Sequence, residues 1–173
     1  MTNKKFLLGM LVMVLAFGMT VTGCDIEDDS KSDIEITWNG HRYKRISQSK
    51  TWNEAKSYCE SLGGYLATII SAEEQAAVYN LIADGDKNVY WIGGYLTGDG
   101  WVWVTGEQWM YTNWALGEPN DQGGNESCTQ MYRKNNYDGT NSAGKWNDIV
   151  RTGWDDTTGF FSLKNTGFIC EWD

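Results

Sequence analysis

The chain has 173 residues, 41% of them apolar, and contains ten tryptophans and nine tyrosines. This composition allows a packed core and excludes a disordered chain, because disordered segments are poor in aromatic residues. The formal net charge is −9, which disfavours nucleic acid and anionic membrane surfaces as partners.

The first 23 residues are predicted to be a secretory signal peptide. Lys4 and Lys5 precede an apolar run over residues 6–21, which is shorter than the about 20 residues of a membrane span. Its end, Val21-Thr22-Gly23-Cys24, resembles the lipobox of bacterial lipoproteins. That resemblance implies that Cys24 is lipidated and anchors an exported protein to the membrane of a bacterial cell envelope or surface. An ordinary signal peptide with an incidental cysteine is one alternative, and an uncleaved membrane anchor is another.

Residues 24–33 are expected to form an acidic, flexible tether, and residues 34–173 a folded domain. Apolar and polar residues alternate from Ile34 to Trp38, and a turn-like Asn39-Gly40 follows. This pattern predicts a strand or hairpin at the start of the domain. His41 is the only histidine, and on an exposed strand we expect it to be simply solvated.

Two helices are predicted next. Thr51 and Ser71 are each followed three residues later by glutamate, which is the capping-box pattern. Apolar residues at helical spacing follow both. Gly63-Gly64 ends the first helix, and the second stops near Asp84-Gly85.

The remainder is predicted to be strands and loops. The predicted strands cover residues 89–92 (ending at Gly93-Gly94), 101–104, 128–132, 145–150 and 167–172. Long polar segments over residues 111–127, 133–144 and 151–166 separate them. Long loops inside a compact domain are often functional, and the candidate ligand residues lie on or beside these.

A series of motifs in fixed order resembles the C-type lectin-like domain over Ile34 to Asp173. The motifs are Tyr90-Trp91-Ile92-Gly93-Gly94, Trp101-Val102-Trp103, Thr112-Asn113-Trp114, Gly117-Glu118-Pro119-Asn120, Trp146-Asn147-Asp148 and Phe168-Ile169-Cys170-Glu171. The resemblance implies an α+β double-loop fold, in which the two ends pair in one sheet. Two helices then flank antiparallel sheets, and a long loop region carries the ligand site.

The resemblance also implies a disulfide between Cys59 and Cys170. It would close a loop of about 110 residues and contribute on the order of 4–5 kcal/mol, and it suits an exported protein. Cys128 matches a third family cysteine, but residues 149–169 contain no partner. We therefore expect a free thiol, either a small buried hydrophobic group or one half of an intermolecular disulfide.

Five residues match the principal calcium site of the family: Glu118, Asn120, Glu126, Asn147 and Asp148. Carboxylate and amide oxygens are the ligands that calcium takes. In the family, four of them also bind sugar hydroxyls, here Glu118, Asn120, Glu126 and Asn147. The order Glu-Pro-Asn is similar to the mannose-type variant, which selects equatorial vicinal hydroxyls, and it implies a cis peptide bond before Pro119.

Two features beside this site are ambiguous in the sequence. Asp121 fits an additional calcium site, but Ser127 stands where a second acid would help. Tyr137 and Trp154, on insertions flanking the site, are candidates for stacking on a sugar. Phe160-Phe161 would form a contact patch, unless the aromatic residues of the insertions anchor their own loops.

We therefore expect calcium-dependent carbohydrate binding by a surface-anchored bacterial lipoprotein, serving adhesion or glycan recognition. The alternative is a protein-binding module in which calcium only orders the loops. The chain offers no Ser-His-Asp set, no histidine cluster and no paired general acid and base, so an enzyme is not expected. The sequence does not indicate which sugar is bound, nor the oligomeric state.

Overall fold

The protein is described here from a computed structural model covering residues 34–136, 139–153 and 159–173. It contains β1 (Glu35–Trp38), β2 (His41–Ile46), α1 (Trp52–Ser61), β3 (Tyr65–Leu66), α2 (Ala72–Ile82), β4 (Val89–Thr97), β5 (Gly100–Trp103), β6 (Cys128–Tyr132), β7 (Trp146–Ile149), the 3-10 turn η2 (Leu163–Asn165) and β8 (Thr166–Trp172). The strands form one sheet in the order β1-β2-β8-β4-β6-β7, with β3 on β8 and β5 on β4. In the part of the chain so described, no helix combines the length and apolar character needed to cross a bilayer.

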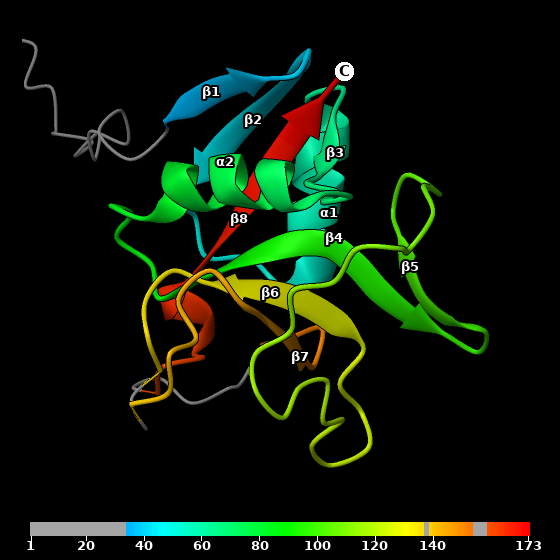
Figure 1. Ribbon diagram of the computed structural model, residues 1–173, viewed down its shortest axis with the longest axis vertical. Helices are drawn as coiled ribbons and strands as arrows, with labels where there is room; N and C mark the ends of the chain where they lie inside the picture. Colours follow the sequence, from blue (N-terminus) through cyan, green and yellow to red (C-terminus); the bar gives the residue numbers. More distant parts are fainter. Residues whose placement is uncertain (1–33, 137–138, 154–158) are drawn as a thin grey trace, which may run out of the picture.

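The two ends of the domain lie side by side, as predicted (Figure 1). Asn39 and Gly40 both adopt positive φ, 47° and 94°, which is the geometry of a tight hairpin turn, and they join β1 to β2. β2 then pairs antiparallel with β8 in the register Arg42 to Trp172 and Tyr43 to Glu171. β8 also runs parallel to β4, so the last strand ties the end hairpin to the rest of the sheet.

The helix starts follow the sequence signals, with one correction. Thr51 caps α1 through the complete predicted capping box with Glu54. At α2, Ser71 accepts a hydrogen bond from the Glu74 backbone N–H at 3.1 Å. The Glu74 carboxylate instead accepts from Ile70 N at 2.7 Å and from the Tyr43 hydroxyl at 2.5 Å. The second capping box is therefore only partly confirmed. The Glu74 carboxylate does not accept a hydrogen bond from the Ser71 backbone N–H, because it is buried beside Tyr43.

Two clusters of buried side chains form the core. One joins α2 to the indoles of Trp103 and Trp146, and the other joins α1 to Phe168 and Ile46. The Cys59–Cys170 disulfide expected from the sequence lies within the second cluster and connects α1 to β8. The helices and the end strands are thus held together by both apolar burial and a covalent link.

The fourth strand is longer than predicted. β4 does not end at Gly93-Gly94 but continues to Thr97, with a shift in its pairing to β6 between Trp91 and Tyr95. A Cβ atom on Gly93 would lie 2.5 Å from the Leu66 carbonyl, and one on Gly94 would lie 2.6 Å from Thr129 Oγ1. These glycines therefore permit close approach inside the sheet rather than ending a strand.

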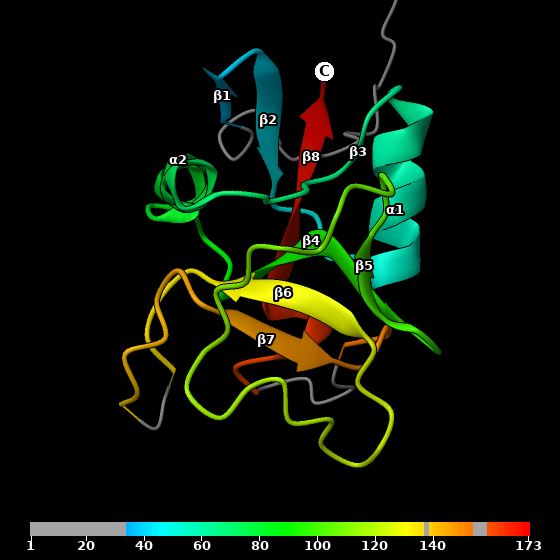
Figure 2. The ribbon, with the colours of Figure 1, turned by 45° about the vertical axis from the view of Figure 1, so that its right-hand side comes forward.

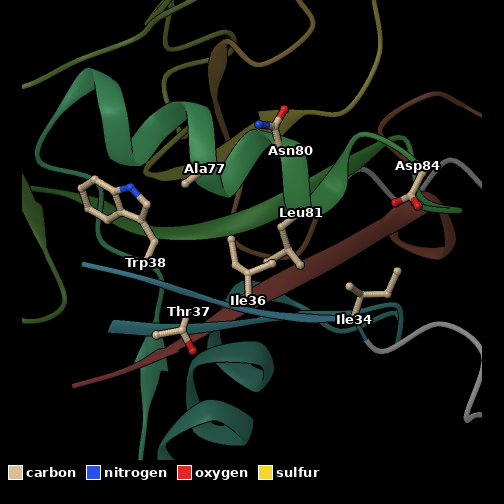
Figure 3. A pocket seen from close by; sticks show the side chains of 8 residues that line it. All are labelled: Ile34, Ile36, Thr37, Trp38, Ala77, Asn80, Leu81 and Asp84. Atoms are coloured by element: carbon tan, nitrogen blue, oxygen red, sulfur yellow. The ribbon is translucent and has the colours of Figure 1, made fainter. Parts of the chain in front are cut away.

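A mostly apolar groove of about 330 Å³ lies between β1 and α2 (Figure 3). Its lining residues are Ile34, Ile36, Thr37, Trp38, Ala77, Asn80, Leu81 and Asp84. None of these is a site residue predicted from the sequence.

Candidate functional site

The long loop from β5 to β6 is docked on β7 before it reaches the Glu-Pro-Asn segment. Trp114 forms a bridge to Trp146, Ala115 N donates to the Trp146 carbonyl at 2.8 Å, and Trp146 N donates to the Asn113 carbonyl at 2.8 Å. The loop that follows lies toward the end of the molecule away from the tip of β8 (Figure 2). This docking brings the segment from residue 118 next to the Asn147-Asp148 pair.

Two buried carboxylates hold the backbone of this loop. Asp148 is 1% exposed, and its two oxygens accept hydrogen bonds from Asn120 N at 3.0 Å and Asp121 N at 2.9 Å. Glu126 is 4% exposed and accepts from Gln122 N at 2.8 Å. The same Gln122 N–H also donates to Asn120 Oδ1 at 2.8 Å. Backbone N–H groups therefore fix the orientation of both carboxylates.

Glu118 completes a convergence of three carboxylates. Its peptide bond to Pro119 is cis, the geometry that the resemblance implied. Burial, then a hydrogen bond to Asp148, then repulsion from Asp148 and Glu126 raise the pKa of Glu118 to about 7. Its Oε2 atom is buried and has no hydrogen-bond partner among the described residues. Such converging, partly buried negative charge is compensated by a cation in a typical protein site, and the oxygen donors fit calcium.

The fifth predicted calcium ligand is placed differently from the other four. Asn147 is buried, and its Oδ1 accepts a hydrogen bond from the Tyr132 hydroxyl at 3.3 Å. Hydrogen bonds and charge thus connect Glu118, Asn120, Glu126 and Asp148 directly, whereas Asn147 joins them through its neighbour Asp148. The sequence did not indicate this role of Tyr132, because it depends on the pairing of β6 with β7.

The candidate second calcium site consists of groups that bond within the protein. Asp121 adopts a positive φ of 45°, and its Oδ1 accepts from Glu126 N at 3.0 Å. Ser127 Oγ accepts from Arg151 Nε at 3.2 Å. Asp121 therefore braces the loop around Glu126, a role that its sequence position beside Asn120 did not reveal.

The insertion aromatics that the structure describes anchor their loop. The rings of Phe160 and Phe161 lie 6.1 Å and 5.7 Å from that of Tyr132, and both are half-buried. This contact favours the anchoring interpretation over an exposed patch. Tyr137 and Trp154, the candidates for sugar stacking, lie outside the described residues, as do Cys24 and the rest of residues 1–33.

Cys128 is a free cysteine and is fully buried. Burial raises the pKa of its thiol to about 12, so the reactive thiolate is suppressed. The interpretation as a small buried hydrophobic group is confirmed, and an intermolecular disulfide is disfavoured because the folded sheet covers the sulfur.

The prediction that His41 is simply solvated is wrong. Its Nδ1 atom lies 2.9 Å from Glu171 Oε1, and Glu171 is 1% exposed. The pairing of β2 with β8 brings these residues together across 130 positions of sequence. The expected pairing of the two chain ends was the one signal that pointed to this contact.

Comparison with known proteins identifies the family. The profile described as lectin C-type domain matches residues 48–171. The chain belongs to the C-type lectin family. Membership places it among binding proteins rather than enzymes.

Two relatives of this C-type lectin domain are animal lectins. A lectin of Pleurodeles waltl is 32% identical over 149 residues, covering 80% of this chain and 82% of the relative. Ladderlectin of Oncorhynchus mykiss is 32% identical over 108 residues, and the match spans 60% of this chain but only 53% of ladderlectin. Among solved structures, the cow C-type carbohydrate-recognition domain of CD23 matches with a TM-score of 0.60 and 28% identity, covering 80% of this chain and 92% of that one.

Proposed function

We propose that this C-type lectin domain binds carbohydrate through a calcium ion. The ligands of that ion would be Glu118, Asn120, Glu126, Asn147 and Asp148. The observation that carries the proposal is the buried, unpartnered Oε2 of Glu118 beside Asp148 and Glu126. Calcium takes six to eight oxygen ligands, and it would offset the charge of these three carboxylates.

The side chains of the site suit a pair of neighbouring sugar hydroxyls. A carboxylate only accepts hydrogen bonds, whereas an amide whose oxygen faces a metal still has an NH₂ group to donate. Glu118 with Asn120, and Glu126 with Asn147, thus offer each hydroxyl one acceptor and one donor beside the ion. We propose the mannose-type preference for equatorial vicinal hydroxyls, supported by the Glu118-Pro119-Asn120 order. The cow CD23 domain, described in the presence of a GlcNAc2Man3 oligosaccharide, supports the same ligand class.

The proposed setting is a bacterial lipoprotein anchored through Cys24, with a role in adhesion or glycan recognition. This part rests on residues 1–24 alone, because the relatives named above are animal proteins. Anchoring many copies on one surface would raise avidity, since each further binding event becomes effectively intramolecular.

Retention on immobilised sugar tests the proposal. Full-length protein, in detergent where needed, is applied with calcium to mannose, N-acetylglucosamine, fucose and galactose columns and eluted with chelator. We expect retention on the first three that is lost with chelator. Asn120→Asp should abolish it, because the exchange removes the NH₂ donor while keeping an oxygen. Asn125→Asp is the matched control: it adds the same charge to the same loop at an exposed residue outside the ligand set.

Each alternative has its own result. Binding that survives chelator would contradict the role of calcium. A calcium-dependent rise in the melting temperature without retention on a broad glycan array would favour the protein-binding alternative. If Asn125→Asp abolished binding as fully as Asn120→Asp, the effect would be one of loop charge and not of the ligand set.

A further inference from the structure

The pairing of the two end strands places four polar side chains on one face of the sheet. Tyr43 lies opposite Glu171 and Arg42 opposite Trp172. Directly paired residues project to the same side, and alternate residues share a face. His41 and Tyr43 of β2 therefore stand beside Glu171 and Asp173 at the end of β8. This end of the sheet lies away from the calcium-site loop (Figures 1 and 2).

Three metal-binding atoms converge there. His41 Nδ1 lies 2.9 Å from Glu171 Oε1 and 3.3 Å from Asp173 Oδ1, and all three atoms lie within 4.8 Å of one another. Tetrahedral zinc with bonds of about 2.0–2.2 Å holds its ligand atoms about 3.3–3.6 Å apart. The distance from His41 to Asp173 already lies in this range, and His41 and Glu171 would have to move apart by about 0.5 Å to hold an ion between them.

Further groups orient the two carboxylates. Thr68 N donates to Glu171 Oε2 at 2.7 Å, which directs Oε1 toward His41. The Tyr65 hydroxyl donates to Asp173 Oδ1 at 2.5 Å and lies 3.4 Å from Glu171 Oε1. Outer hydrogen bonds of this kind position metal ligands and tune their affinity.

The local charge balance also favours a cation. Glu171 and Glu74 are 1% and 3% exposed, and the Tyr43 hydroxyl lies between them, 3.3 Å and 2.5 Å from their oxygens. Among the described residues, the ion pairs of Glu171 include one basic partner, His41. The side chains of His41 and Asp173 are 34% and 81% exposed, so an ion can reach the cluster from solvent.

We propose that His41 Nδ1, Glu171 and Asp173 form a binding site for zinc or a similar first-row transition metal, independent of the calcium site. One imidazole nitrogen and two carboxylate oxygens are ligands that zinc accepts, with a fourth position left for water. A nitrogen ligand separates this cluster from the loop site, because imidazole suits zinc, copper and nickel, whereas calcium takes oxygen.

Since His41 is the only histidine in the chain, it provides a unique spectroscopic probe. Full-length protein labelled with ¹⁵N-histidine is kept in saturating calcium, so that the loop carboxylates are occupied. Zinc chloride is then added, and the imidazole nitrogens are followed by NMR beside isothermal titration calorimetry. We expect one equivalent of zinc to move the Nδ1 resonance. His41→Gln and Asp173→Asn should each weaken zinc binding at least tenfold.

The controls separate the two sites. Asp99→Asn, which neutralises an exposed carboxylate in the β4–β5 turn, should leave zinc affinity unchanged. Because Asp173 is largely exposed, Asp173→Asn tests the site even if His41→Gln fails to fold. Zinc binding that leaves the His41 resonances in place, or that persists in both variants, would overturn the proposal. So would equal displacement of those resonances by calcium alone, because a calcium site would not need the nitrogen.

Discussion

Two carboxylate clusters lie toward opposite ends of this domain and are built in different ways. In the loop cluster, Asp148 and Glu126 accept hydrogen bonds from backbone N–H groups of a segment without regular structure. In the strand-end cluster, Glu171 is held by the β2–β8 ladder, by Thr68 N and by His41. Three carboxylates converge at the loop, so its shape should depend on a bound cation. The strand-end geometry should persist without one, because the ladder fixes it.

Breaking the disulfide should have the largest effect. The Cys59–Cys170 link spans 111 residues, so replacing both cysteines by serine should cost about 4–5 kcal/mol of unfolding free energy in the chain-entropy model. Urea denaturation in calcium measures it, and chemical reduction of the wild type is the control, since Cys128 is already a thiol. A loss under about 1 kcal/mol would mean that burial alone holds α1 against β8.

Removing one charge from the loop cluster should be the next largest effect. Asp148→Asn keeps the side-chain shape but removes one unit of charge and one of the two oxygens that accept backbone hydrogen bonds. We expect calcium affinity to fall at least about 100-fold, roughly 2.7 kcal/mol, with zinc affinity unchanged. Calorimetry measures both, with Asp99→Asn as the control. Less than a threefold change would remove Asp148 from the ligand set.

A smaller effect is expected from a substitution beside the strand-end cluster that should change zinc binding and leave calcium binding unchanged. Tyr65→Phe removes the hydroxyl that donates to Asp173. The lost orientation should weaken zinc binding about tenfold, the lower range for outer-shell partners. Calcium affinity should not change, because Tyr65 contacts none of the loop ligands in the described contacts. A parallel loss of calcium binding would show that the clusters are coupled.

The smallest expected effect is a pH dependence of the calcium-free protein. The pKa of Glu118 is raised from an ordinary 4.5 to about 7, so the folded state holds this proton more tightly than the unfolded state. The protonated Glu118 therefore adds to the free energy of unfolding below about pH 4.5, and this gain is lost as the pH rises through about 7. In chelator, the melting temperature should therefore fall by a few degrees across this window.

The substitution Glu118→Gln and the addition of calcium each test how much Glu118 contributes to this pH dependence of the melting temperature. The pKa of buried Glu171 is also raised to about 7 and adds a slope of the same sign. Glu118→Gln should therefore reduce the slope without abolishing it. Saturating calcium should flatten or reverse it, since the ion favours the ionised carboxylates. An identical slope in Glu118→Gln would place the whole effect elsewhere.

Local signals in the sequence predicted the elements that depend on near neighbours. The capping box at Thr51 starts α1, and the strand predicted over residues 128–132 is β6. The candidate ligands on the loop were equally visible, because Glu118, Asn120 and Glu126 lie within nine residues and carry their own motif. The motif order of the family was enough to assign Asn147 and Asp148 to the same candidate site.

Features that depend on long-range packing were not predictable in the same way. Gly93-Gly94 signals a strand end locally, but the closeness of Leu66 and Thr129 makes glycine a requirement for continuing β4. In the sequence, Glu74 completes a capping box, but in the structure its carboxylate accepts a hydrogen bond from the hydroxyl of Tyr43, 31 residues earlier. His41 reads as a solvated strand residue until the register of β2 against β8 is known. In each case the decisive neighbour lies far away in sequence.

Because Cys128 is buried, the reaction of its thiol with a labelling reagent can report local opening of the sheet. Its sulfur lies at the start of β6, two residues after Glu126, and no solvent reaches it in the folded sheet. With Cys59 and Cys170 joined and Cys24 replaced by serine, it would be the only thiol left to label. The rate of labelling would then measure how often the strand beside the proposed calcium site separates from its neighbours. A ligand that stabilises the neighbouring loop should lower the labelling rate of Cys128, even when the average structure is unchanged.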